Sequence, residues 1–216
     1  QRPHGFLLSH RVFRCNGGKS SHLPRPVLAV HRAGTRQLAG HYLPPQSALA
    51  SILGIDMLIA EQWVLVTGGA RGLGQSITRA LAREGAGVVI NYHHSDKAAA
   101  ALAEELGPRA MALQADVTDT AAVHTLFAQA HERTGQPISS VANNALVGFQ
   151  FDGDARPQIG DIAWQRFNQQ IEGAVKGALN TLQAALPGMR AQGFGRIVNV
   201  GTNLFQNPVV PYHDYT

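Results

Sequence analysis

The fold is decided by one short stretch, Val64-Leu65-Val66-Thr67-Gly68-Gly69-Ala70-Arg71-Gly72-Leu73-Gly74. Three apolar residues, as in a buried strand, run directly into a glycine-rich segment. Apolar residues then recur at the spacing of one helix face, at Leu73, Ile77, Ala80 and Leu81. The stretch therefore predicts a β-strand, a tight turn and an α-helix in that order.

The same unit is repeated along the chain. Ser95 is expected to cap the helix after the second strand, and Thr118 or Asp119 the helix after the third. A long helix is expected from about residue 162 to 190, with a kink near Pro187. The expected strands are residues 64–66, 88–90, 110–115, 139–142 and 197–200. Strands and helices that alternate in this way predict an α/β fold with a Rossmann-type, doubly wound parallel sheet.

The glycines of the turn have separate physical roles. Gly68 allows the chain to turn tightly, Gly72 lets the backbone approach a pyrophosphate, and Gly74 lets helix and strand pack closely. The free N–H groups and the positive end of the helix would then favour phosphates. A glycine-rich turn can also be purely structural, and its place between a strand and a helix is what favours dinucleotide binding.

The choice between the two nicotinamide cofactors depends on the end of the second strand. An acid there would hydrogen-bond the ribose 2′-hydroxyl, whereas a basic residue nearby suits a 2′-phosphate. The sequence has Asn91-Tyr92-His93-His94, with no acid before Asp96, and Arg71 lies within the turn. These residues favour NADP(H), with the alternative that Arg71 is only a solvated turn residue.

Three later features join the turn to form a recognisable pattern. They are Asp116-Val117 after the third strand, Asn143-Asn144-Ala145 after the fourth, and Gly195-Arg196-Ile197-Val198-Asn199 through the fifth, leading to Tyr215. In this order they resemble the short-chain dehydrogenase/reductase family, in its 3-oxoacyl-[acyl-carrier-protein] reductase-like branch. The resemblance covers about residues 57–216.

The resemblance implies a set of cofactor contacts. Asp116 would contact the adenine, with Val117 beside it, and Asn143 and Asn144 would brace the sheet and border the cofactor. Asp116 could equally serve as an acid at the start of a helix. Leu146 stands where the family normally has glycine. The cofactor-binding residues implied are Thr67, Gly68, Gly69, Arg71, Gly72, Leu73, Gly74, Asn91, Asp116, Val117, Asn143, Asn144 and Ala145.

The resemblance also implies a catalytic pair, Tyr215 and Thr202. In the family a Tyr gives a proton to the carbonyl during hydride transfer, and a Ser thirteen residues earlier holds the substrate oxygen. Thr202 lies thirteen residues before Tyr215 and supplies the same hydroxyl. Tyr212 competes by residue type, but Asn199 lies thirteen residues before it.

Two further family residues are not found where the pattern predicts them. A Lys four residues after the Tyr would lower the Tyr pKa from its ordinary value of about 10, but position 219 is beyond the sequence. The helix Asn of the family falls on Ala174 or Ile171 by two counts that differ by three residues. That disagreement suggests an insertion before or within the long helix. Asn168 or Asn180 could substitute, although each is better explained as a surface or packing residue.

The resulting interpretation is an NADP(H)-dependent reductase that converts a carbonyl, such as a 3-oxoacyl thioester, to a secondary alcohol. The substrate would be a small molecule, either free or carried on acyl-carrier protein, and the full-length protein would be a homo-oligomer. The alternative is a non-catalytic dinucleotide-binding module, favoured by the missing Asn, by Leu146 and by Thr202 in place of Ser. Because proteins of the family continue well beyond their Tyr, we expect a domain incomplete at its C-terminus, with an exposed sheet edge, poor solubility and no turnover.

Charge separates the first quarter of the chain from the rest. The net charge is +4 over 216 residues, but residues 1–56 carry +6 and residues 57–216 carry −2. The charge of the folded part therefore does not support nucleic-acid binding, and a protein that binds nucleic acid through residues 1–56 is the third alternative. Residues 1–56 lack the periodicity of a fold, and we interpret them as a disordered leader or extension upstream of a start at Met57, with a transit peptide as the alternative. The single cysteine, Cys15, excludes an intramolecular disulfide and a cysteine metal cluster, and no apolar run is long enough for a membrane helix. We expect a cytoplasmic protein without a metal.

Overall fold

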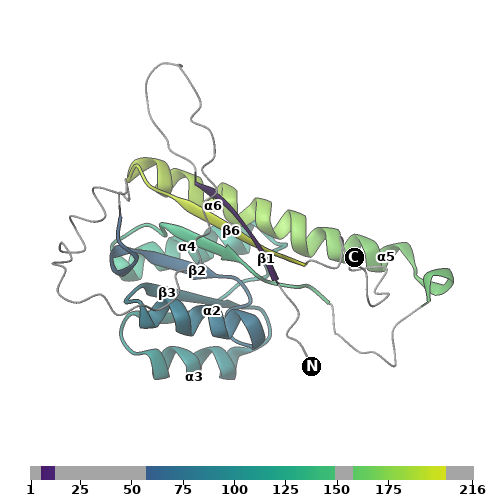
Figure 1. Cartoon of the computed structure of the whole chain (residues 1–216), viewed down its shortest axis with the longest axis horizontal. Helices are drawn as coiled ribbons and strands as arrows, with labels where there is room; N and C mark the ends of the chain where they lie inside the picture. Colours follow the sequence, from purple (N-terminus) through teal and green to yellow (C-terminus); the bar gives the residue numbers. More distant parts are fainter. Residues whose placement is uncertain (1–5, 13–56, 149–157, 203–216) are drawn as a thin grey trace, which may run out of the picture.

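The computed structural model describes residues 6–12, 57–148 and 158–202. In this part of the chain, six strands form one sheet in the order β1-β6-β5-β2-β3-β4 (Figure 1). All pairs among the last five strands are parallel. These five strands are β2 (Trp63–Val66), β3 (Gly87–Tyr92), β4 (Ala110–Gln114), β5 (Ser140–Asn143) and β6 (Arg196–Thr202). The predicted parallel α/β sheet is confirmed.

Helices connect the parallel strands and cover both faces of the sheet. Figure 1 shows α2 and α3 on one side of the sheet and α5 and α6 on the other. The helices are α2 (Gly72–Arg83), α3 (Asp96–Leu106), α4 (Thr120–Thr134), α5 (Trp164–Ile171) and α6 (Gly177–Ala191). Two single-turn 3-10 helices, η1 (Ile59–Glu61) and η2 (Ile159–Asp161), precede β2 and α5.

Neighbouring residues of the central strands pack into different apolar clusters. Leu65 belongs to the core that also contains Leu126 of α4 and Ala185 of α6. Val64, the residue before Leu65, packs instead with Leu81 of α2 in a separate cluster. A strand that alternates between two buried faces has no need of polar residues, which explains the continuous apolar runs in the sequence.

Two N-cap residues were predicted from the sequence, and one of them makes the expected capping hydrogen bonds. The Asp119 carboxylate accepts hydrogen bonds from the backbone N–H groups of Ala121 and Ala122, at 2.8 and 3.1 Å. Of the two expected caps for α4, Asp119 is therefore the one used. Ser95 stands at the N-cap position of α3, but its side chain makes no capping hydrogen bond.

The long helix is interrupted at a different place from the one expected. Between α5 and α6, residues Glu172–Lys176 form the π-helical turn η3, in which the Gly177 N–H bonds the Glu172 carbonyl. Such a turn accommodates about one additional residue within a helix, which is fewer than the three residues by which the two sequence counts differ. Pro187 lies inside α6, which continues past it to Ala191.

One segment of residues 1–56, for which we expected no stable fold, is described as part of the sheet. Residues Phe6–Val12 form strand β1, which pairs antiparallel with β6 from Phe6 opposite Thr202 to Val12 opposite Arg196 (Figure 1). The expected exposed edge at β6 is thus covered over these seven residues. An unpaired strand edge offers N–H and C=O groups to any extended segment, whatever its position in the sequence. The rest of the leader lies outside the described residues.

Candidate functional site: the crevice between the ends of β2 and β5

The sheet topology creates a crevice at the carboxyl ends of β2 and β5. From β2 the chain crosses through α2 to β3 on one side, and it later returns to β5 on the other side of β2. The loops that leave β2 and β5 therefore diverge, and ligands of open α/β sheets bind between such loops. The loop after β2 is the glycine-rich turn, and the loop after β5 contains Asn144 and Ala145.

The backbone of the turn requires its glycines. Gly68 and Gly72 have φ angles of +61° and +54°, in the left-handed region that side chains disfavour. A Cβ atom on Gly74 would lie 2.7 Å from Asn144 Nδ2 and 2.9 Å from the Gly68 carbonyl carbon. The first turn of α2 is thus pressed against both loops, with its free N–H groups at the crevice.

Thr67 and Asn144 tie the two loops together. The backbone N–H groups of Asn144 and Ala145 donate to Thr67 Oγ1 at 2.9 and 3.0 Å. In return, Asn144 Nδ2 donates to the Thr67 carbonyl at 3.1 Å. These bonds fix the width of the crevice before any ligand is bound.

Asn91 connects the turn to the next two strands. Its side chain is 2% exposed at the end of β3, where Oδ1 accepts from the Gly68 N–H at 3.3 Å. Its Nδ2 donates to the Ala115 carbonyl, after β4, at 3.0 Å. A residue expected to contact the cofactor is therefore already engaged in holding the turn.

Sequence reasoning missed two buried threonines that support the site. Thr78 of α2 is fully buried and donates from Oγ1 to the Gly69 carbonyl at 3.2 Å. Thr181 of α6 donates to Asn143 Oδ1 at 2.8 Å. Both threonines lie on the apolar face of a helix, and this position could have identified them. A buried hydroxyl needs a hydrogen-bond partner, which predicts a contact with a neighbouring loop or strand.

Asn143 braces the sheet on the side of β6. Its Nδ2 donates to Asn199 Oδ1 of β6 at 2.9 Å. Thr202, the proposed substrate-orienting residue, is the last residue of β6 and is partly buried at the same end of the sheet. Tyr215 and its competitor Tyr212 lie outside the described residues.

Asn168 and Asn180, the two residues that could substitute for the helix Asn of the resemblance, have different surroundings. Asn180 is 4% exposed; its Nδ2 donates to the Val117 carbonyl at 2.9 Å, and its Oδ1 accepts from Thr120 Oγ1 at 3.1 Å. Asn168 bonds the Glu172 carboxylate one helical turn away, at 3.2 Å. Asn180 is thus a packing residue between α6 and the loop after β4.

The π-helical turn brings the long helix close to the loops after β5 and β4. A Cβ atom on Gly173 would lie 2.8 Å from Val147 Cβ, and one on Gly177 would lie 2.9 Å from Val117 Cγ2. Two glycines four residues apart therefore let the helix approach the loops after β5 and β4. Leu146, within the first of these loops, is 48% exposed.

Asp116 and two histidines form a polar corner at the ends of β3 and β4. Asp116 Oδ1 accepts from the Thr118 N–H and Oγ1, each at 2.8 Å, and its Oδ2 lies 4.0 Å from His93 Nδ1. The rings of His93 and His94 stack with their centroids 3.6 Å apart. Burial alone would raise the pKa of Asp116, but the Thr118 hydrogen bonds and the two histidines outweigh it and lower that pKa below its ordinary value.

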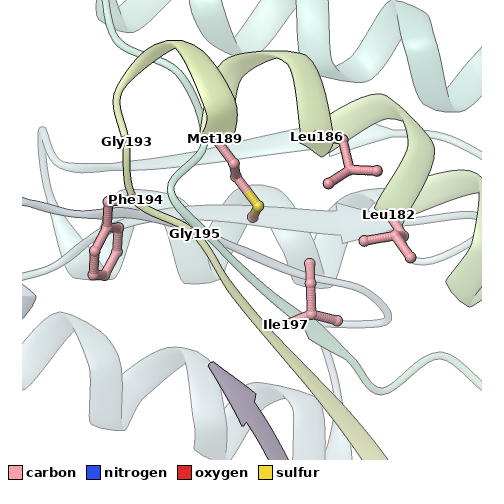
Figure 2. Close-up of a pocket in the computed structure, with 7 residues that line it drawn as sticks. All are labelled: Leu182, Leu186, Met189, Gly193, Phe194, Gly195 and Ile197. Carbon is pink, nitrogen blue, oxygen red and sulfur yellow. The ribbon is translucent and has the colours of Figure 1, made fainter. Parts of the chain in front are cut away.

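An apolar pocket lies far from this crevice along the sheet. Figure 2 shows Leu182, Leu186 and Met189 of α6 gathered around Ile197, near the start of β6. The pocket is therefore at the amino end of β6, whereas the glycine-rich turn and Thr202 are at the carboxyl ends of their strands. Its apolar lining offers no group to orient a polar ligand.

Within residues 6–12, 57–148 and 158–202, no group of three or more His, Cys, Asp or Glu side chains is placed to hold a metal ion. None of the helices described there has both the length and the hydropathy needed to span a bilayer.

Comparisons with known proteins identify the family of the chain and relatives with the same fold. A family model described as short chain dehydrogenase matches residues 62–216. The chloroplastic NADPH-dependent aldehyde reductase 2 of Arabidopsis thaliana is 29% identical over 183 residues, which are 79% of this chain and 66% of that protein. A 3-oxoacyl-[acyl-carrier-protein] reductase of Staphylococcus aureus is 33% identical over 141 residues, covering 64% of this chain and 54% of that protein.

Two solved structures are similar in fold and contain a nicotinamide cofactor. A gluconate 5-dehydrogenase from Burkholderia cenocepacia, in complex with NADP and tartrate, superposes with a TM-score of 0.55 at 30% identity, over 64% of this chain and 52% of that one. A blue fluorescent protein from a metagenomic library, in complex with NADPH, superposes with a TM-score of 0.61 at 27% identity. This match covers 74% of this chain and 65% of that one. This chain thus spans between about half and two thirds of the length of these proteins.

Proposed function

The chain belongs to the short-chain dehydrogenase family, and on this premise we propose that it carries the cofactor site of an NADP(H)-dependent oxidoreductase that reduces a carbonyl to a secondary alcohol. The observation that carries the proposal is the crevice, in which the positive-φ turn and Gly74 are pressed against Asn144. Such a turn at a topological switch point suits a pyrophosphate.

The residues around the crevice fit the parts of a dinucleotide. The N–H groups of the turn and of the start of α2 would bind the pyrophosphate, with Arg71 beside the 2′-phosphate. Asp116 and Val117 would border the adenine, and Asn144 and Ala145 the nicotinamide. When bound, NADPH supplies the hydride. Thr202 would orient the carbonyl oxygen and Tyr215 would give it a proton.

The finer proposal concerns the substrate. We propose a 3-oxoacyl thioester, supported by the resemblance of the motifs and by the Staphylococcus aureus relative. The competing function is a dinucleotide-binding module without catalysis. It is favoured by Leu146, which is 48% exposed, and by Asn180, whose amide nitrogen and oxygen each make a packing hydrogen bond.

A binding and turnover experiment separates these functions. NADPH titrated into this chain should give saturable binding, and the full-length protein should oxidise NADPH in the presence of a 3-oxoacyl thioester. Cofactor binding without turnover on any of a panel of carbonyl compounds would favour the non-catalytic module. Absence of binding would refute the proposed cofactor site.

Replacement of Arg71 by glutamate is expected to lower the preference for NADPH over NADH by about tenfold or more. The new carboxylate would face the 2′-phosphate at the N-cap position of α2 and repel it. Arg83→Glu, at the other end of the same helix, is the matched control and should leave the ratio of the two dissociation constants unchanged. An unchanged ratio in Arg71→Glu would place the 2′-phosphate elsewhere.

We also propose that the full-length protein is a homo-oligomer that buries the outer face of the long helix. Trp164, Ile171, Val175 and Leu179 are 66%, 50%, 63% and 49% exposed, and an apolar row of this kind is typical of an interface. Val175→Glu should reduce the molecular mass found by light scattering to that of a smaller assembly. The control Gln129→Glu, on the exposed face of α4, should leave that molecular mass unchanged. Wild-type protein that is monomeric at micromolar concentration would contradict the proposal.

A further inference from the structure

We propose that strand β1 protects the outer edge of β6 from pairing with a second copy of this chain. When β1 is released, two copies pair through their β6 strands, antiparallel and about a two-fold axis. The inference goes beyond the proposed function, because it concerns the edge of the sheet and involves no cofactor.

The outer edge of β6 accepts an antiparallel strand along its whole length. Strand β1 pairs with it from Phe6 opposite Thr202 to Val12 opposite Arg196 (Figure 1). On its inner side β6 pairs parallel with β5. Because the N–H and C=O groups of an edge strand are recognised through backbone geometry, any extended segment that presents its own groups in the same direction fits there. The outer edge of β6 is therefore a surface for strand addition.

Strand β1 is held on one side only. Within the described residues it is the last strand of the sheet and pairs with β6 alone, and residues 13–56 tether it to Met57. Val12 lies opposite Arg196, whose N–H donates to the Ser139 carbonyl at 3.0 Å, and Ser139 lines the same cleft as Met57. Both ends of the tether thus lie at the amino ends of neighbouring strands, so pairing within one chain needs no long reach. A strand with one neighbour is also among the first to open.

The sequence of β6 favours association when its edge is open. Arg196–Thr202 reads Arg-Ile-Val-Asn-Val-Gly-Thr, which is rich in β-branched residues and has one charge and no proline. Short segments of this composition pair with one another when they are exposed. No residue of β6 is fully buried, whereas the four residues of β2 are at most 8% exposed. Strand β4, at the opposite edge, is shorter and follows Pro108 and Arg109, residues of the kind that protect an edge.

A second β6 in the register of β1 is complementary to the first. With the two-fold axis at Asn199, Arg196 lies opposite Thr202 of the second copy, and Val198 lies opposite Val200 of the second copy. Like charges do not face each other in this register. The new ladder has the same seven residues of β6 that β1 now uses. The two-fold symmetry closes the assembly at a dimer.

The protection depends on the covalent tether. A tethered strand is present at its site at an effective concentration of the order of 1 mM, about a hundredfold above a second copy in a solution of about 10 µM. For ladders of similar strength, β1 therefore occupies the edge of β6 at micromolar concentrations. Loss of β1 pairing should lower the dissociation constant of the dimer by about tenfold or more.

Two adjacent prolines in β1 test the inference. Successive N–H groups of an antiparallel strand point alternately toward and away from its neighbour, so Leu7→Pro with Leu8→Pro removes a donor to β6 in either phase. Ala29→Pro with Val30→Pro, in the leader outside β1, is the matched control. All chains also carry Val175→Glu, so that the long helix does not contribute to association. In sedimentation velocity, the double-proline variant of β1 should dimerise at concentrations about tenfold or more below those needed by the control.

Cross-linking and competition identify the edge that pairs. Asn199→Cys, combined with Cys15→Ser, brings two thiols together at the two-fold axis, because opposite Cα atoms of antiparallel strands are about 4.5–5.5 Å apart and a disulfide spans this distance. Oxidation should link two copies of the double-proline variant through this position. Gln114→Cys, on β4 at the opposite edge, is the matched control and should give no link. A peptide of residues 5–13 at about 1 mM should return the dimer to monomer.

The contrary outcomes are specific to β1 and β6. A double-proline variant that stays monomeric up to about 100 µM would overturn the protective role of β1. Links through Gln114→Cys in place of Asn199→Cys would assign the contact to the other edge and overturn the proposed pairing. Precipitation of the double-proline variant that the peptide prevents would support the inference, and precipitation that the peptide does not prevent would overturn it.

Discussion

Replacement of Gly74 by alanine is expected to abolish NADPH binding in the micromolar range and to lower the free energy of unfolding by about 1–3 kcal/mol. The added methyl carbon would lie 2.7 Å from Asn144 Nδ2 and 2.9 Å from the Gly68 carbonyl carbon. The second of these contacts is with backbone, which cannot move unless the glycine-rich turn itself moves. Stability and binding should therefore fall together.

Two further glycine variants separate this clash from other effects. Gly160→Ala adds a methyl group with no atom within 4 Å, and should change neither stability nor binding. Gly72 is also open, but its φ of +54° makes alanine strained there by about 1 kcal/mol. Urea denaturation and NADPH titration of the three variants provide the comparison. A Gly74→Ala protein with wild-type stability and affinity would show that the crevice is not held as described.

The repeating strands and helices could be predicted because their signals are local. Buried parallel strands require unbroken apolar runs, and Leu65 and Val89 lie in such runs at the centre of the sheet. The start of α4 was predictable for the same reason, since Asp119 caps N–H groups only two and three residues away. The glycines of the turn were identified by their order between a strand and a helix.

Features that depend on distant partners could not be predicted in this way. Strand β1 forms because β6, about 190 residues later in the chain, presents an edge, and no periodicity in the leader indicates that pairing. The contact of His93 with Asp116 requires the register of β3 on β4, in which Tyr92 lies opposite Gln114. Sequence spacing alone does not determine such a register.

The π-helical turn could not be predicted for a different reason. Its sequence, Glu172–Lys176, has the composition of an ordinary helix, and only the disagreement between two counts indicated an irregularity. The turn seats Gly173 and Gly177 against Val147 and Val117. It thereby fits the long helix against the loops after β5 and β4, while Asn180 is used in packing. The structure thus gives this helix a supporting role at the site that residue matching did not identify.

Replacement of Tyr215 by phenylalanine is expected to lower the kcat of the full-length protein about 10²–10⁴-fold while the dissociation constant of NADPH stays unchanged. This loss of rate is the one expected when a general acid is removed. Phenylalanine keeps the ring and removes only the hydroxyl that would give a proton to the substrate oxygen. Tyr212→Phe is the matched control and should retain activity. If instead Tyr212→Phe were inactive and Tyr215→Phe active, the assignment of the proton donor would have to be exchanged.

Variants of Thr202 test the second member of the proposed catalytic pair. Thr202 is the last residue of β6, a strand that is also held by the hydrogen bond between Asn199 and Asn143, so the variants must separate a catalytic effect from an effect on packing. Thr202→Val removes the hydroxyl at nearly constant volume and should also reduce kcat by about tenfold or more, as expected for a lost hydrogen bond to the reacting oxygen. Thr202→Ser restores the hydroxyl and should recover most of the rate. Loss of activity in both variants would point to strand packing as the cause. Full activity in Thr202→Val would remove Thr202 from the mechanism even if Tyr215 proves essential.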